Sequence, residues 1–185
     1  MRKSYNFLKV SERKIILAVI GRDGKIDDEV KKICYNIGRN IAKANCILIC
    51  GGMKGVMEGA CRGASENSGL TIGILPTGNK DDANKYVRIS IATGIGFARN
   101  AIITSAADGI IAINGKHGTL SEIGFALGYD KPVVLVNGSK GICDDLDFSK
   151  AKFENLYKAD AEDAVNLCLN LIKNKYLRAE KNSCP

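Results

Sequence analysis

Short apolar runs alternate with helix-like segments along almost the whole chain, and no other sequence feature constrains the fold as strongly. Runs that are apolar throughout are typical of strands covered on both faces of a parallel sheet. The strands are predicted at residues 14–20, 46–50, 70–75, 86–91, 109–113 and 132–136. This order predicts an α/β protein with a mostly parallel sheet.

Segments with helical periodicity connect these strands. The first, at 27–44, has an acidic first turn and places Ile33, Ile37 and Ile41 on one face. Further helices are predicted from the turn GGMKG to residue 68 and at 94–105, 119–129 and 160–174. We therefore expect a Rossmann-like three-layer α/β/α fold with about six or seven strands. At 185 residues and 45% hydrophobic composition, residues 1–185 are predicted to form one domain.

The distribution of charge bears on the partners of the chain. Its net charge of +7 comes from residues 1–14 and 173–185, whereas residues 15–172 contain 18 basic and 18 acidic side chains. Nucleic-acid binding is therefore disfavoured, and the aromatic content of 6% agrees. No apolar run approaches the roughly 20 residues of a membrane span, so we expect a cytoplasmic protein without a membrane partner.

Seven cysteines raise the question of disulfides or metal ligands. The number is odd and several lie in apolar runs, which favours buried free thiols. Cys46 and Cys50 would lie about 13 Å apart on one strand, too far to share a metal ion or a disulfide. We expect neither a metal nor an organic cofactor.

Glycines gather where predicted strands end, and ligands of open α/β sheets bind beyond those carboxyl ends. Gly21 follows the first strand, and Gly51, Gly52 and Gly55 form the GGMKG turn after the second. Such turns let backbone amides and a helix N-terminus approach an anion. The turn matches neither GxxxxGK[ST] nor a first-strand GxGxxG, and a tight turn without a ligand is an alternative.

The turn after the fifth strand, NGKHGTLSE, leads directly into a helix. Thr119 and Glu122 have the spacing of a capping box, which is a purely structural alternative. Upstream, in TGIGFARN, Arg99 lies near the start of another helix at the same expected edge. A guanidinium and a carboxylate near phosphate-sized turns indicate a nucleotide or another phosphorylated small molecule as the partner. A solvated Arg99 on a helix surface is the simpler alternative.

Three segments in order resemble the LOG family: GGMKGVMEGACRGA, TGIGFARNAIITSAADGIIAI and NGKHGTLSEIGFAL. This family is also labelled lysine decarboxylase-like. The chain is most similar to its shorter branch, which is related to the DNA-processing protein DprA and contains the molybdenum cofactor carrier protein of algae. The resemblance extends over about residues 14–173. It implies a Rossmann-like nucleotide-binding domain that forms a homodimer or a higher homo-oligomer through helices near the site.

LOG enzymes, including cytokinin riboside 5′-monophosphate phosphoribohydrolases, cleave the N-glycosidic bond of nucleoside 5′-monophosphates. By position in the signature PGGxGTxxE, the resemblance implies that Glu122 orients water and stabilises an oxocarbenium-like transition state. Arg99 is the second implied catalytic residue. The residues expected to bind phosphate or nucleotide are Gly21, Gly51, Gly52, Gly55, Gly115, Lys116, Gly118 and Thr119.

The signature is altered at Asn114, where the family has Pro, at Lys116, where it has Gly, and at Asn100, where it has Lys. Lys116 would either be strained by a positive φ or add a contact to phosphate. His117 occupies a variable position and is interpreted as a turn residue. Hydrolysis therefore has two rivals: a non-catalytic carrier of molybdenum cofactor or another phosphorylated cofactor, and, less favoured, DprA-like single-stranded DNA binding. No feature indicates a pyridoxal-phosphate site.

Overall fold

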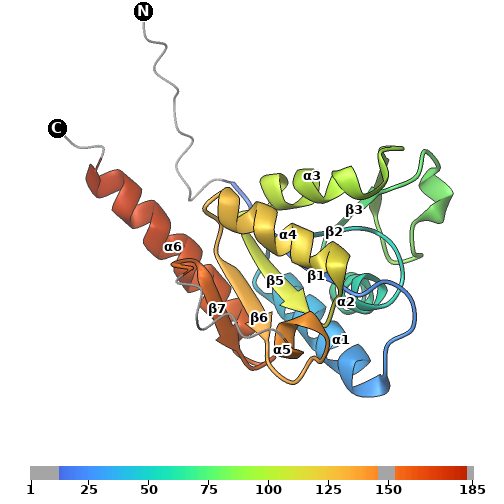
Figure 1. Cartoon of the computed structure of the whole chain (residues 1–185), viewed down its shortest axis with the longest axis horizontal. Coiled ribbons are helices and arrows are strands. Elements are labelled where there is room, and N and C mark those ends of the chain that lie inside the picture. Colours follow the sequence, from blue (N-terminus) through green and yellow to red (C-terminus); the bar gives the residue numbers. More distant parts are fainter. Residues whose placement is uncertain (1–12, 146–152, 183–185) are drawn as a thin grey trace, which may run out of the picture.

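The computed structural model describes residues 13–145 and 153–182 (Figure 1). Within these ranges a single sheet contains seven strands, all parallel, in the order β4-β3-β2-β1-β5-β6-β7. The strands are β1 Ile16–Gly21, β2 Ile47–Cys50, β3 Thr71–Leu75, β4 Ile89–Ala92, β5 Gly109–Ile113, β6 Val133–Val136 and β7 Leu156–Ala159. The predicted Rossmann-like α/β fold is therefore confirmed.

The chain enters the sheet at its centre and winds outward in two directions. It runs from β1 to β4 on one side, then returns to place β5 directly beside β1. The direction of winding reverses between these two strands, and such a switch point leaves a crevice outside the carboxyl ends of the strands. The turns after β1, β2 and β5 consequently meet at one edge.

The helices cover both faces of the sheet, and α3 and α4 lie side by side on one of them (Figure 1). The helices are α1 Asp28–Lys43, α2 Val56–Ser65, α3 Arg99–Ala106, α4 His117–Gly128, α5 Ile142–Asp145 and α6 Ala164–Asn182, with short 3-10 turns η1 Lys80–Asp82 and η2 Gly96–Ala98. Helix α1 begins one residue after the predicted start, because Asp27 is its N-cap and accepts a hydrogen bond from the amide of Val30 at 2.9 Å.

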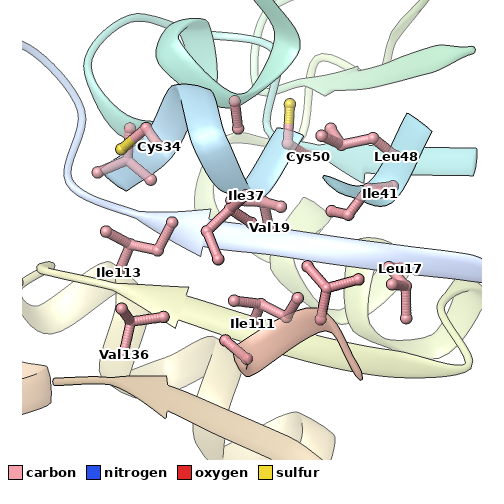
Figure 2. Packing of buried hydrophobic residues seen from close by; sticks show 14 of the residues in the cluster. Leu17, Val19, Cys34, Ile37, Ile41, Leu48, Cys50, Ile111, Ile113 and Val136 are labelled. Carbon is pink, nitrogen blue, oxygen red and sulfur yellow. The ribbon is translucent and has the colours of Figure 1, made fainter. Parts of the chain in front are cut away.

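Two hydrophobic cores lie against the two faces of the sheet. One packs α1, α2 and α6 on the sheet, where Val19 of β1 lies under Ile37 of α1 (Figure 2). The other joins Ile20 to Ile103 and Ile123 under α3 and α4. Burial on both faces explains why these strands are apolar throughout.

Several predicted boundaries were wrong. Strand β4 begins at Ile89 instead of residue 86, since a turn closed by a hydrogen bond from Val87 to Asn84 precedes it. The helix predicted at 94–105 is η2 followed by α3, because Gly94 and Gly96 have positive φ values of 68° and 58°. Strand β7 and helix α5 were not predicted individually.

The six cysteines of the described ranges are buried and free, as expected, and Cys184 lies outside those ranges. None of the helices in 13–145 and 153–182 is long and apolar enough to cross a membrane.

Candidate functional site

The predicted site residues follow neighbouring strands at the carboxyl edge. Gly21 at the end of β1 pairs with Ile113 at the end of β5, so the turns after these strands begin side by side. A Cβ on Gly21 would lie 2.2 Å from the carbonyl oxygen of Ile113. Close packing between the strands therefore requires Gly21 whether or not a ligand binds.

Arg99 is the first residue of α3 and is buried, with 9% of its surface exposed. Its Nη1 donates a hydrogen bond to the carbonyl oxygen of Ile74 at 2.8 Å, and its Nε has no hydrogen-bond partner in the described chain. Burial lowers the pKa of Arg99, and the nearby charge of Glu122 opposes this shift. No carboxylate of the described residues lies within 4.0 Å of the guanidinium, so the cation is buried without a direct counter-ion. The alternative of a solvated surface arginine is excluded.

Glu122 lies in α4 and is 7% exposed. No hydrogen bond or ion pair to its carboxyl occurs among residues 13–145 and 153–182. Burial raises the pKa of Glu122 to about 8, although the charge of Arg99 acts to lower it. The carboxyl is therefore mainly protonated at neutral pH.

Helix α4 begins without a side-chain cap. It starts at His117, two residues before the predicted start, so Thr119 is its third residue and the capping box with Glu122 does not form. No side chain accepts a hydrogen bond from its first turn, in contrast to α1. The first amides of a helix have no partner within the helix, so this N-terminus is suited to an anion.

The amides of the turn after β2 are largely engaged within the protein. The Lys54 amide donates to the carboxylate of Asp23 at 3.0 Å, and the Val56 amide donates to the carbonyl oxygen of Arg22 at 3.0 Å. The Gly52 amide points to the sulfur of Cys50 at 3.3 Å. Gly52 and Gly55 both have positive φ. This turn therefore offers an anion fewer free donors than α4 does.

The altered signature residues have clear backbone roles. Lys116 has a φ of −142° and is exposed, so it is unstrained and its ammonium group can reach solvent or a ligand. Asn114 instead adopts a φ of 59°, and its side-chain oxygen accepts a hydrogen bond from the amide of Gly115 at 2.7 Å. That bond occupies the Gly115 amide. Gly118 has room around it, since an added Cβ would meet only the ring of Phe97, at 3.4 Å.

Three residues of this region had no predicted role. Asn100 is 2% exposed and donates to the Ser121 hydroxyl at 3.0 Å, which joins α3 to α4. Asn84 donates to the carbonyl oxygens of Met53 at 2.8 Å and Gly52 at 3.1 Å, which fixes the turn after β2. Phe97 is 80% exposed beside Gly118. No local sequence signal identifies Asn84, because its partners lie more than thirty positions away.

A pair of thiols lies under the turn after β2. The sulfur atoms of Cys50 and Cys61 are 3.4 Å apart and both residues are fully buried. The hydrogen bond between them lowers the pKa of Cys50 and raises that of Cys61. In the described ranges, no three His, Cys, Asp or Glu side chains are grouped so that they could hold a metal ion.

A cavity of about 770 Å³ lies between α1 and α2, away from Arg99 and Glu122. Of the predicted site residues, only Gly55 lines it. The remaining predicted residues gather around the switch point instead.

Comparison with known proteins places the chain among close relatives. The model of the family described as LDcluster4: SLOG cluster4 family matches residues 14–166. An uncharacterized protein of Archaeoglobus fulgidus is 38% identical over 160 residues, which cover 83% of this chain and 94% of the relative. Two solved structures are also similar. The molybdenum cofactor binding protein of Rippkaea orientalis has a TM-score of 0.79 and 36% identity, covering 87% of this chain and 99% of that protein. The molybdenum cofactor carrier protein of Chlamydomonas reinhardtii has a TM-score of 0.74 and 32% identity, with coverages of 85% and 99%.

Proposed function

Since the chain belongs to the SLOG cluster4 family, we propose that it is a non-catalytic carrier of a phosphorylated cofactor of the molybdenum-cofactor class. The phosphate would lie at the N-terminus of α4, near Gly118 and Thr119, with the guanidinium of Arg99 beside it. The names of the two solved relatives, a molybdenum cofactor binding protein and a carrier protein, support this class of cargo.

One observation carries the proposal: an uncapped helix N-terminus and a buried guanidinium, which has no carboxylate within 4.0 Å among the described residues, both lie at the carboxyl edge of the sheet. A buried cation is costly unless an anion compensates it. Asn100 joins the two features, because it follows Arg99 and its side chain reaches the carbonyl oxygen of Gly118 at 3.4 Å. A phosphate dianion would satisfy the amides and the cation together.

The raised pKa of Glu122 is compatible with a carrier. A carboxyl group with a pKa of about 8 is mainly neutral at pH 7, so it does not repel a phosphate. The same neutral group does not supply the carboxylate that the resemblance assigns to it, whereas a raised pKa would suit a general acid that protonates a leaving group. Single-stranded DNA binding has less support still, since residues 15–172 have no net positive charge.

The carrier is further proposed to be a homodimer or higher homo-oligomer built through α3 and α4. Ile102 of α3, Leu120 and Phe125 of α4, and Tyr129, which caps the end of α4, are each more than 40% exposed. Gly124 and Gly128 of α4 have open space where a side chain would begin. Such an apolar face with glycines allows a second copy to approach closely, and a protein rarely leaves a face of this kind open to water.

The test is equilibrium binding of molybdenum cofactor, freshly released from a molybdoenzyme, to the purified protein. Retained molybdenum is measured by mass spectrometry and the oxidised pterin by fluorescence. Arg99→Ala is expected to weaken retention at least about tenfold, because it removes the buried cation. Arg88→Ala is the matched control, since Arg88 is exposed and directly precedes β4 at the edge of the sheet.

A parallel incubation with a panel of nucleoside 5′-monophosphates distinguishes the hydrolase. If the wild type releases free base and ribose 5-phosphate and Glu122→Gln does not, the protein is a hydrolase and the carrier proposal is wrong. Equal retention by wild type and Arg99→Ala, with both variants folded by thermal melting, would rule out the proposed phosphate site.

A further inference from the structure

The cavity between α1 and α2 has the size of a ligand site. Its volume of about 770 Å³ lies within the range of roughly 300 to 1,000 Å³ that small-molecule sites occupy. It extends from the turn after β1, at Gly24, along the groove between the two helices. It shares Gly55 with the turn after β2, but Arg99, Glu122 and the first turn of α4 do not line it.

Positive charge is concentrated on its wall. The cationic residues that line it are Lys25, Lys31, Lys32, Lys54 and Arg62. These are five of the 18 basic residues of the segment 15–172, whereas only one of its 18 acidic residues, Glu58, lines the cavity. If the cavity wall were an ordinary solvated surface, basic and acidic residues would be expected to line it in similar numbers.

Three of these cations have no ionic partner within the described chain. Lys31 pairs with Asp28 at 2.8 Å and Arg62 pairs with Glu66 at 2.9 Å. Lys25, Lys32 and Lys54 form no ion pair with residues 13–145 or 153–182. Three free ammonium groups around one concave surface provide several contacts for the oxygens of one or two phosphate groups.

The same wall carries two aromatic rings. Tyr35 and Tyr86 are half-buried and line the cavity. The guanidinium carbon of Arg62 lies 5.8 Å from the centre of the Tyr35 ring, so a cation and an aromatic surface are adjacent. Aromatic rings stack with nucleobases, and ammonium groups bind phosphate.

We infer that the cavity between α1 and α2 is a second ligand site, which binds a nucleoside phosphate through Lys32, Lys54 and Lys25, with the base against Tyr35. The inference does not depend on the proposed cofactor site, because the two use different side chains. The turn at 51–55 lies between them, so a ligand in the cavity would contact the loop that also borders Arg99.

The test uses ADP and inorganic pyrophosphate as probes in isothermal titration calorimetry at low and moderate salt. Lys32→Ala combined with Lys54→Ala is expected to weaken ADP binding at least about tenfold, with affinity falling as salt rises. Lys43→Ala combined with Lys80→Ala is the matched control, because it removes equal charge from exposed positions outside the cavity. Tyr35→Leu is expected to weaken ADP binding and to leave pyrophosphate binding unchanged.

ADP binding that is unaffected by the Lys32 and Lys54 substitutions, or no ADP binding at millimolar concentration, would overturn the inference. So would loss of ADP binding in Arg99→Ala, since the nucleotide would then occupy the edge of the sheet. Equal affinities for ADP and pyrophosphate, insensitive to Tyr35→Leu, would overturn the role of the base. Retention of molybdenum cofactor is expected to weaken in Arg99→Ala and to stay unchanged in Lys32→Ala combined with Lys54→Ala. The two proposals can therefore fail independently of each other.

Discussion

Nη1 of Arg99 lies 1.8 Å from the position that a Cβ on Gly51 would occupy. The guanidinium therefore rests directly on the backbone of the turn after β2, where no other residue would leave room for it. The Gly51 backbone and the Ile74 carbonyl together hold a cation in a site that water barely reaches.

Gly51→Ala should displace the Arg99 guanidinium while leaving the backbone of the turn in place, because the obstacle is the end of a side chain. We expect cofactor retention to weaken at least about tenfold and the melting temperature to fall only slightly. Gly78→Ala is the control, since an added Cβ there meets nothing within 4 Å. Unchanged retention in Gly51→Ala would show that the position of Arg99 does not matter for binding.

Glu122 should make the protein less stable as the pH rises. Above the usual pKa of 4.5 the unfolded chain loses this proton, whereas the folded protein keeps it until about pH 8. The free energy of unfolding should therefore decrease between these values and level off above about pH 8. Glu122→Gln removes this dependence, so its advantage over wild type should grow to a few kcal/mol by pH 9.

Urea unfolding at pH 5, 7 and 9 measures this effect, and Glu154→Gln provides an exposed control. Parallel pH profiles for wild type and Glu122→Gln would mean that the folded Glu122 carboxyl ionises normally.

Asn84→Ala should loosen the turn after β2. The substitution leaves the carbonyl oxygens of Gly52 and Met53 without their side-chain donor, which should cost about 1 to 2 kcal/mol in unfolding free energy. Hydrogen exchange of the amides at 51–55 should accelerate in this variant. Asn170→Ala, at an exposed position of α6, should leave both quantities almost unchanged.

Phe125→Glu should convert the proposed oligomer into monomers, because it places a charge on the apolar face of α3 and α4. Multi-angle light scattering after size-exclusion chromatography gives the mass. Leu177→Glu, on the exposed surface of α6, is the matched control. A wild-type mass equal to one chain would refute the oligomer directly.

The central strands and α1 could be predicted because their signals are local. Leu17, Ala18 and Val19 are all buried, so both faces of β1 are apolar. Asp27 caps α1 through a hydrogen bond from the amide of Val30, only three positions away. Strand β7 escaped prediction because Leu156–Ala159 is short, lies at the edge of the sheet and contains an exposed lysine. Its place depends on pairing with β6, which no local pattern encodes.

The candidate site residues were chosen from the ordered motifs, but their burial, hydrogen bonds and pKa values could not be predicted from those motifs. A capping box between Thr119 and Glu122 fits the sequence equally well, and only the actual start of α4 at His117 excludes it. The burial of Arg99 and the raised pKa of Glu122 come from the packing of α3 and α4 on the sheet. The hydrogen bond from the Lys54 amide to the Asp23 carboxylate joins residues 31 positions apart. Neither segment alone predicts it.

The positive φ of Asn114 limits how this chain can change. Proline cannot adopt a φ of 59°, since its ring fixes φ near −65°. Replacing Asn114 alone by the proline of the hydrolase signature would therefore disrupt this turn and would not give it the conformation of that signature. Any evolutionary or engineered route between the two signatures therefore has to change the backbone conformation of this turn together with residue 114.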